Sequence, residues 1–234
     1  MEKEELVQRS PVRVLMNSIN GGLQGGELGV VASPSGIGKT SVLVQIALDK
    51  LLRGKKIIHI SFTRHTDYVL VWYEDIFNQF IKKKKLENEP DIKNDIVKNR
   101  VLMKFTQGGI SSDQILRSLR ALIKDGSFNA DVMIIDGYDF SAAEEGHVAA
   151  IKAFAEEMGL AVWYSCNVNG KKPPYNKHNI PVVIENCVEH FAVVLVLDPK
   201  PDYIALTISK NREVSPPGHP ALKLDPKTLL MLES

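Results

Sequence analysis

The sequence predicts an α/β protein with a mostly parallel central sheet and antiparallel strands near its C-terminus. Over the first two thirds of the chain, short apolar runs alternate with helical patterns of about 12 to 16 residues, which is typical of βαβ crossovers. The run at residues 132–135 contains no polar residue, as expected for a central strand that is covered on both faces. In the last third the apolar runs lie too close together for crossover helices, so those strands should pair antiparallel.

The pattern places each element in turn. Parallel strands are expected at residues 28–32, 56–62, 100–106, 131–136 and 160–167. Helices with a period near 3.6 are expected at residues 39–52, 66–82, 112–124 and 143–158. The C-terminal strands are expected at residues 191–198, 203–210, 221–224 and 228–232.

Length and charge suit a single globular unit. A chain of 234 residues can bury a sizeable core, and we expect one domain over residues 1–234. The net charge of +1 gives no overall field that would draw the protein to nucleic acid or an anionic membrane. No apolar run reaches the roughly 18 residues of a spanning helix, so we expect no membrane contact.

The N-terminus and the cysteines indicate a compartment. The first residues are polar and acidic, unlike a secretory signal. Cys166 and Cys187 make neither a disulfide framework nor a zinc site, and Cys166 lies within an apolar strand as a small hydrophobe. These features predict a reduced, cytoplasmic protein.

A small-residue loop between an apolar strand and a helix is the most informative feature. Backbone N–H groups of such a loop point at an anion, which the helix dipole also favours. Lys39 would reach the outer phosphates of a nucleotide, and the Thr40 hydroxyl would ligate magnesium. Ser33 stands where the usual spacing has glycine, and a plain packing turn is the alternative. The expected nucleotide contacts are Ser33, Pro34, Ser35, Gly36, Ile37, Gly38, Lys39, Thr40 and Ser41.

Asp136 supplies the second half of a magnesium–triphosphate site. Four apolar residues precede it, and Gly137 follows to release the chain. A carboxylate at a strand end near the loop would hold the metal through water, opposite the direct Thr40 ligand. The alternative is an aspartate that only caps the next turn.

Residues 82–99 form a charged insertion, which begins with lysines and continues through acidic residues. The simpler interpretation is a solvated helix end and a mobile excursion. A contact with nucleic acid or a partner is the alternative, and the acidic residues argue against it.

The residues Gly21-Gly22-Leu23-Gln24-Gly25-Gly26-Glu27-Leu28 ahead of the loop resemble the start of the RecA-like ATPase core. Pro34-Ser35 is similar to DnaB-type replicative helicases, and residues 35–40 are similar to the KaiC-like ATPases. The resemblance runs from about residue 14 to residue 232. It implies a three-layer RecA-like P-loop core that binds ATP and Mg²⁺.

The same resemblance assigns roles to distant residues. Asn167 stands where the family carries a polar sensor of the γ-phosphate, and Ser209-Lys210-Asn211-Arg212 looks like its Lys-x-Arg element. Lys210 and Arg212 would then reach a neighbouring subunit and stabilise the transition state as an arginine finger does. This implies a homo-oligomeric ring or filament with ATP at its seams. A solvent-exposed basic hairpin is the alternative.

One position departs from the family pattern. Members carry a glutamate that polarises the attacking water, and Thr63 stands at the equivalent place, followed by Arg64. A threonine hydroxyl cannot serve as that general base. Asp67, Glu74 or His65 could substitute if the next helix folds over the γ-phosphate.

Three functions are therefore open. The first is a RecA-like protein that hydrolyses ATP slowly as an oligomer. The second, which Thr63 supports, is a non-hydrolysing signalling or scaffold module. The third is a small-molecule kinase, although residues 82–100 hold only one arginine for a lid.

A helicase version of the first function needs a nucleic-acid contact. Residues 170–178 follow the strand that ends at Asn167. Lys171, Lys172 and Lys177 could meet the phosphates of a single strand, and Tyr175 could stack on a base. An ordinary Pro-rich surface loop is the simpler interpretation.

Overall fold

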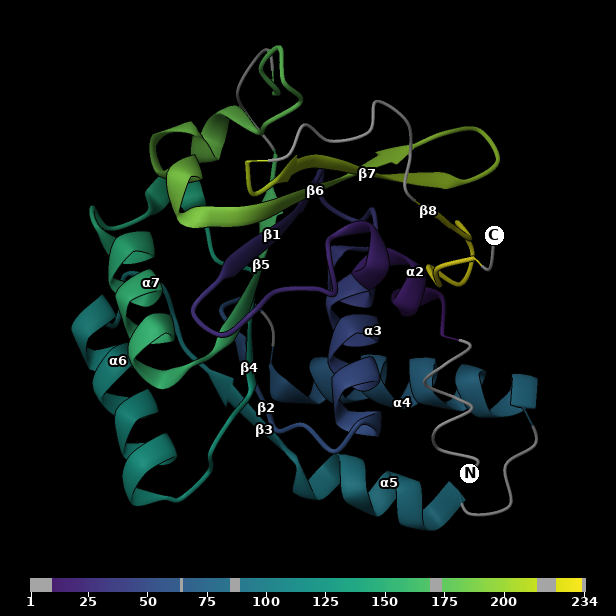
Figure 1. Ribbon diagram of the computed structural model, residues 1–234, viewed down its shortest axis with the longest axis horizontal. Helices are drawn as coiled ribbons and strands as arrows, with labels where there is room; N and C mark the ends of the chain where they lie inside the picture. Colours follow the sequence, from purple (N-terminus) through teal and green to yellow (C-terminus); the bar gives the residue numbers. More distant parts are fainter. Residues whose placement is uncertain (1–9, 64, 85–88, 169–173, 214–221, 233–234) are drawn as a thin grey trace.

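The computed structural model describes residues 10–63, 65–84, 89–168, 174–213 and 222–232, which build one eight-stranded sheet (Figure 1). The strand order is β3-β2-β4-β5-β1-β6-β7-β8. The six strands from β3 to β6 in this order run parallel, whereas β7 and β8 add antiparallel at one edge. The strands are β1 (Leu28–Ser33), β2 (Ile57–Ser61), β3 (Arg100–Lys104), β4 (Val132–Asp136), β5 (Ala161–Asn167), β6 (Phe191–Pro199), β7 (Ile204–Asn211) and β8 (Leu222–Leu224). The predicted α/β class and its mixed, mostly parallel sheet are confirmed.

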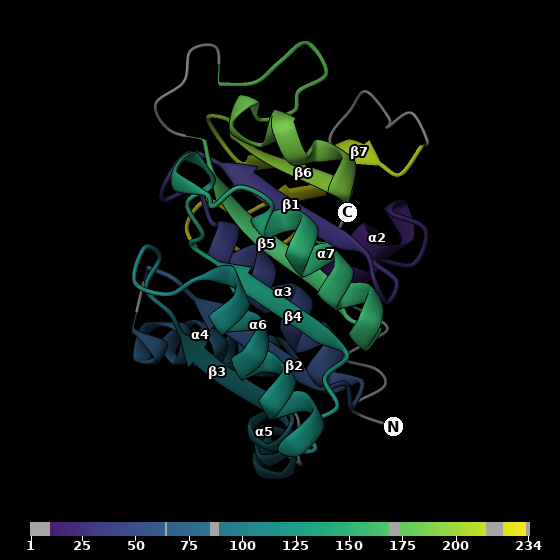
Figure 2. The same ribbon diagram turned by 90° about the vertical axis from the view of Figure 1, so that its left-hand side faces the viewer.

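Helices cover both faces of this sheet (Figures 1 and 2). One face carries α2 (Pro11–Ser18), α3 (Lys39–Leu52), α4 (Thr66–Lys84) and α5 (Glu89–Lys98). The other carries α6 (Ser112–Arg120), the π-helical turn η1 (Ala121–Asp125), the 3₁₀ turn η2 (Phe140–Ala142), α7 (His147–Met158) and the 3₁₀ segment η3 (Val182–His190). Among the described residues, no helix is both long enough and apolar enough to cross a bilayer.

Each face of the sheet has its own apolar core because strand side chains alternate. Val31 and Ile134 pack under α3, whereas their neighbours Val30 and Ile135 pack under α7. All four are buried, as the run without polar alternation predicted. The central strands β1, β2 and β4 are therefore buried along their whole length between two helical layers.

The helix α3 is central to the arrangement. Twelve of its fourteen residues are buried, and it lies against β1, β4 and β5. Its first turn therefore sits above the carboxyl ends of these strands, which are far apart in the sequence.

The interpretation of residues 82–99 as a mobile excursion is wrong over most of its length. Residues 89–98 form α5, and Ile92 and Ile96 are buried in the same core as α3. These two residues lie one turn apart, so a charged sequence still presents an apolar stripe. Residues 85–88 lie outside the described part of the chain.

Two helices and one strand have bounds that differ from those expected. The helix expected at 112–124 ends at Arg120 and continues as a π turn, and the one expected from 143 begins at His147. The strand expected at 228–232 is reduced to a single bridge between Leu224 and Met231. Asp225 accepts hydrogen bonds from the Lys227 and Thr228 amides, and this turn replaces the strand.

Candidate functional site

A cavity of about 540 Å³ opens at the carboxyl edge of the sheet, where the loop after β1 meets α3. Gly36 (φ 82°) and Gly38 (φ 102°) take left-handed backbone conformations there, which side chains disfavour. The lining residues are Ser35, Gly36, Gly38, Lys39, Thr40, Ser41, Thr63, His65, Tyr68, Trp72, Asp136, Gly137, Ser165, Asn167 and Leu229. The predicted loop, Asp136 and Asn167 thus meet at one hollow.

The Lys39 ammonium is held inside the loop. Its Nζ lies 2.8 Å from the Pro34 carbonyl oxygen, 3.1 Å from that of Ser33 and 3.2 Å from Ser33 Oγ. Burial lowers the pKa of Lys39, while Cys166 and Asp136 act in the opposite direction. Ser33 and Pro34 therefore contact the lysine, although they do not line the cavity.

Thr40 and Asp136 meet across 96 positions of sequence. The Thr40 hydroxyl donates to Asp136 Oδ2 at 2.9 Å, and Asp136 is only 6% exposed. The contact exists because α3 spans from β1 to β4 over the intervening β5. A hydroxyl and a carboxylate side by side form a hard oxygen donor set, which fits Mg²⁺.

Several neighbouring strands carry a polar residue at their carboxyl end, on the face that α3 covers. Ser33 of β1 is level with Asn167 of β5, and Asp136 of β4 is level with Ser61 of β2. Ser165 accepts a 2.7 Å hydrogen bond from the Gly137 amide and so fixes the turn after Asp136. Sequence reasoning missed Ser165, although its alternation with Asn167 on β5 was a usable signal.

Two predicted nucleotide contacts have other partners. The Ser41 hydroxyl donates to the Leu229 carbonyl oxygen at 2.8 Å, at the rim of the cavity. Ile37 packs against the apolar core and does not line the hollow. The Leu229 side chain lies against Gly38, where a Cβ would come within 3.3 Å of it. No local motif marks this C-terminal residue, and sequence reasoning missed it.

Thr63 lies beside the residue that follows Asp136. A Cβ on Gly137 would collide with the Thr63 side chain, so glycine permits this packing. The Phe62 amide also donates to the Asp136 carbonyl oxygen at 2.9 Å. The position expected for a catalytic glutamate therefore faces the cavity and holds threonine.

The start of α4 forms the remaining wall. His65, Tyr68 and Trp72 line the cavity, and His65 Nδ1 lies 3.1 Å from Asp67 Oδ2. Glu74 lies outside the cavity, with its carboxylate 4.0 Å from the Lys93 ammonium.

The cavity lies at the carboxyl ends of the parallel strands, whereas Lys210 and Arg212 lie toward their amino ends. Because β7 runs antiparallel to β6, Lys210 pairs with Val194, which in turn pairs with Val30 in the first half of β1. The Lys210 ammonium donates to the Val188 carbonyl oxygen at 2.7 Å. The structure therefore brings neither cation into the cavity of its own chain, and the role toward a neighbouring subunit stays a prediction.

The Arg212 guanidinium bonds within its own chain through all five N–H donors. It binds both Glu27 carboxylate oxygens, at 2.8 and 2.6 Å. The other three bonds reach the carbonyl oxygens of Ile19 (3.1 Å) and Gly22 (3.0 Å) and Asn211 Oδ1 (3.1 Å). Arg212 thus joins the end of β7 to the segment before β1.

The loop proposed for nucleic acid is described only in part. Residues 169–173, with Lys171 and Lys172, lie outside the described residues. Tyr175 packs against the core under α7, and burial raises the pKa of its phenol to about 12. Lys177 is exposed. The Tyr175 ring is thus partly used in packing, which leaves less of it for a base.

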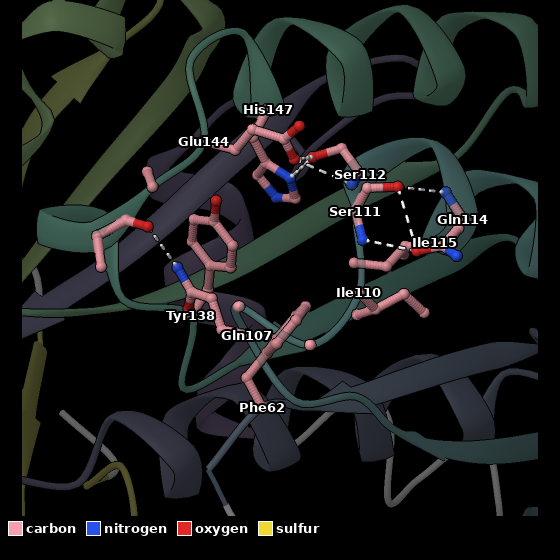
Figure 3. Close-up of a pocket in the computed structure, with 14 residues that line it drawn as sticks. Phe62, Gln107, Ile110, Ser111, Ser112, Gln114, Ile115, Tyr138, Glu144 and His147 are labelled. Atoms are coloured by element: carbon pink, nitrogen blue, oxygen red, sulfur yellow. Dashed lines mark hydrogen bonds between the residues drawn. The ribbon is translucent and has the colours of Figure 1, made fainter.

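A second cavity, of about 440 Å³, opens on the other face of the sheet beside α6 and α7 (Figure 3). Here Ser112 Oγ lies 2.7 Å from both Glu144 Oε2 and His147 Nδ1. His147 Nε2 lies 3.4 Å from the Tyr164 hydroxyl, and the Tyr138 ring stacks on the imidazole at 4.1 Å. No local pattern joins these residues, and sequence reasoning missed them.

The partners of the Ser112 hydroxyl indicate that it is not an activated nucleophile. Burial lowers the pKa of His147 to about 4, so its imidazole is neutral near pH 7. The Glu144 carboxylate can only accept, so Ser112 donates to it and accepts from His147 Nδ1–H. Nε2 then accepts from Tyr164. Because the histidine does not take the serine proton, this row of hydrogen bonds serves to join α6, α7 and β5.

A search with protein-family models finds no match to this chain, and a search of curated proteins finds none either. The fold defines an α/β domain with a mixed, mostly parallel sheet.

Proposed function

We propose that this chain is a RecA-like P-loop protein that binds ATP with Mg²⁺ in the cavity above β1 and β4, and that it hydrolyses ATP slowly. The observation that carries the proposal is the 2.9 Å contact of Thr40 with Asp136. It brings together the two oxygen ligands that a magnesium–triphosphate site needs from positions 96 residues apart.

The loop after β1 and the start of α3 would attract the phosphates of the nucleotide. Lys39 supplies a positive charge, and the N-terminus of α3 adds its dipole and the amides of its first turn. Bound Mg²⁺ would be held by Thr40 and, through water, by Asp136, and would neutralise charge on the phosphates. Asn167, at the end of the neighbouring strand β5, would contact the γ-phosphate.

Slow turnover follows from Thr63. Loss of the glutamate base at this position lowers a rate by up to about 10² to 10⁴-fold, depending on what substitutes for it, whereas the phosphate and metal contacts do not depend on it. The same observation favours a second candidate, a non-hydrolysing module that signals or scaffolds through ATP occupancy. Steady-state phosphate release distinguishes the two, since the second candidate requires turnover at the uncatalysed background.

The proposal includes an oligomeric ring or filament with ATP at the subunit interfaces. This part rests only on the resemblance of residues 209–212 to the Lys-x-Arg element of RecA-like ATPases. In that assembly Arg212 would have to exchange its bonds with Glu27 for a neighbour's nucleotide. Sedimentation with and without ATP and Mg²⁺ tests the assembly directly, and a monomer under both conditions would remove this part.

Titration with a fluorescent ATP analogue tests binding. Lys39→Ala should weaken binding about 10²-fold, because a charged partner of the phosphates is lost. Asp136→Asn should reduce the benefit of added Mg²⁺. Lys124→Ala, which removes an exposed lysine of η1 on the opposite face, is the matched control and should bind normally. An affinity weaker than about millimolar, or equal loss in the control, would refute the proposal.

A further inference from the structure

We propose that His65 is the general base of this cavity, held by Asp67, in place of the glutamate that Thr63 replaces. This inference rests on the proposed ATP hydrolysis and names a further catalytic residue in it. Three side chains near the start of α4 can accept a proton, and the structure distinguishes among them.

The three side chains differ in their position relative to the cavity. His65 lines the same hollow as Thr63, Asp136 and Thr40, whereas neither Asp67 nor Glu74 does. Glu74 lies two turns further along α4, and its carboxylate faces Lys93 at 4.0 Å. Of the alternatives that the sequence left open, only the imidazole therefore faces the place of the reaction.

Two other charged groups of the cavity, Asp136 and Lys39, are already engaged. Asp136 accepts the hydrogen bond of the Thr40 hydroxyl and belongs to the proposed metal site, and Lys39 Nζ is already engaged by three oxygens. The His65 imidazole is the remaining lining group of a type that commonly takes a proton from water in enzymes.

Asp67 lies beside one of the two ring nitrogens of His65. Asp67 Oδ2 lies 3.1 Å from His65 Nδ1, and a carboxylate beside this nitrogen favours the tautomer with the hydrogen on Nδ1. Nε2 then holds the lone pair. Asp67 acts here as a positioning residue, in the way that a carboxylate orients a catalytic histidine elsewhere.

The step balances without a further reactant. The oxygen of a water molecule bonds to the γ-phosphorus while the bond from that phosphorus to the β,γ-bridging oxygen breaks. The proton of the water passes to His65 Nε2, and ADP leaves with the electron pair of the broken bond. The imidazolium returns its proton to solvent, and the products are ADP and phosphate.

The experiment compares His65→Ala, Asp67→Asn and Asp67→Glu with Glu74→Gln, a matched control on the same helix outside the cavity. His65 and Asp67 are both exposed, so these variants should keep the stability of the native chain. Phosphate release is measured at saturating ATP and Mg²⁺, and nucleotide affinity is measured with the fluorescent ATP analogue.

We expect His65→Ala to lower kcat about 10²-fold with unchanged ATP affinity, and added imidazole to restore part of the rate. Asp67→Asn should lower kcat about tenfold, Asp67→Glu should retain most of it, and Glu74→Gln should match the native chain. Rescue by imidazole separates a base from a residue that only supports the fold.

Three results would overturn this inference while ATP binding stands: native turnover in His65→Ala, no gain from imidazole, or native turnover at the uncatalysed background. If instead the ATP analogue fails to bind, or binds equally well to Lys39→Ala, the proposed function itself fails and this inference fails with it.

Discussion

Arg212 and Glu27 are joined by two hydrogen bonds of 2.8 and 2.6 Å, which hold the end of β7 against the start of β1. In this chain the arginine that resembles a trans-acting finger has a complete set of partners of its own. The two assignments make different predictions, because a structural clasp affects unfolding and a finger affects hydrolysis between subunits.

Arg212→Ala should lower the free energy of unfolding by about 2 kcal/mol, a value reduced for partial exposure of the ion pair. Lys210→Ala, which removes only the bond to the Val188 carbonyl, should cost less than about 1 kcal/mol. Urea unfolding of both variants measures the difference. Unchanged unfolding of Arg212→Ala, together with lost ATP hydrolysis in the assembled protein, would instead establish the finger.

Stability should fall on acidification between about pH 6.5 and pH 4. Burial lowers the pKa of both His59 and His147 from 6.5 to about 4, so the unfolded chain binds more protons than the folded one in this interval. Each histidine then costs about 2 kcal/mol between pH 7.5 and pH 5. The stabilisation is complete above the unfolded pKa and is lost below it.

Urea midpoints at several pH values check this dependence. His178→Gln, which changes an exposed histidine, is the control and should keep the native pH profile. A native midpoint that stays constant from pH 7.5 to pH 5 would contradict the assignment of neutral, buried imidazoles.

Gly137→Ala should lower the free energy of unfolding more than Gly146→Ala does, although the backbone strain of the two substitutions is equal. Gly137 (φ 79°) and Gly146 (φ 77°) share the left-handed conformation, which costs roughly 1–2 kcal/mol for alanine. Only at Gly137 would the new Cβ meet Thr63, since the space at Gly146 is open. The extra cost should be about 1–3 kcal/mol.

Unfolding of Gly137→Ala, Gly146→Ala and the double variant Thr63→Ala/Gly137→Ala measures this contact. The double variant should recover part of the loss, and Mg²⁺-dependent binding of the ATP analogue should weaken in Gly137→Ala alone. Equal costs at the two glycines would mean that Thr63 does not press on the turn after Asp136.

The C-terminal turn should loosen when Gln45 is truncated. The Gln45 amide donates to the Leu229 carbonyl oxygen at 3.0 Å and accepts from the Met231 amide at 2.9 Å. Gln45→Ala leaves the buried Met231 amide without that partner and should cost about 2 kcal/mol. Hydrogen exchange at Met231 should accelerate, and exchange as slow as in the native chain would show that the turn is held by other contacts.

Much of the fold could be predicted because its signals are local. Apolar runs without polar alternation identified the buried strands, and the helix expected at 39–52 forms over those residues. The prediction failed where a long-range contact determines the structure. At α5, Ile92 and Ile96 pack into the core beside α3, and no local pattern in the sequence reveals this contact.

The sequence by itself determined the class of the fold and the place of the loop around Lys39 between a strand and a helix, because both depend on residues that are neighbours along the chain. Only the tertiary structure decided which distant side chains join that loop. The contact of Asp136 with Thr40, the packing of Leu229 on Gly38 and the partners of Arg212 depend on strand order and on the path of α3. No local spacing encodes them, because each brings together groups whose separation is set by the packing of the whole sheet.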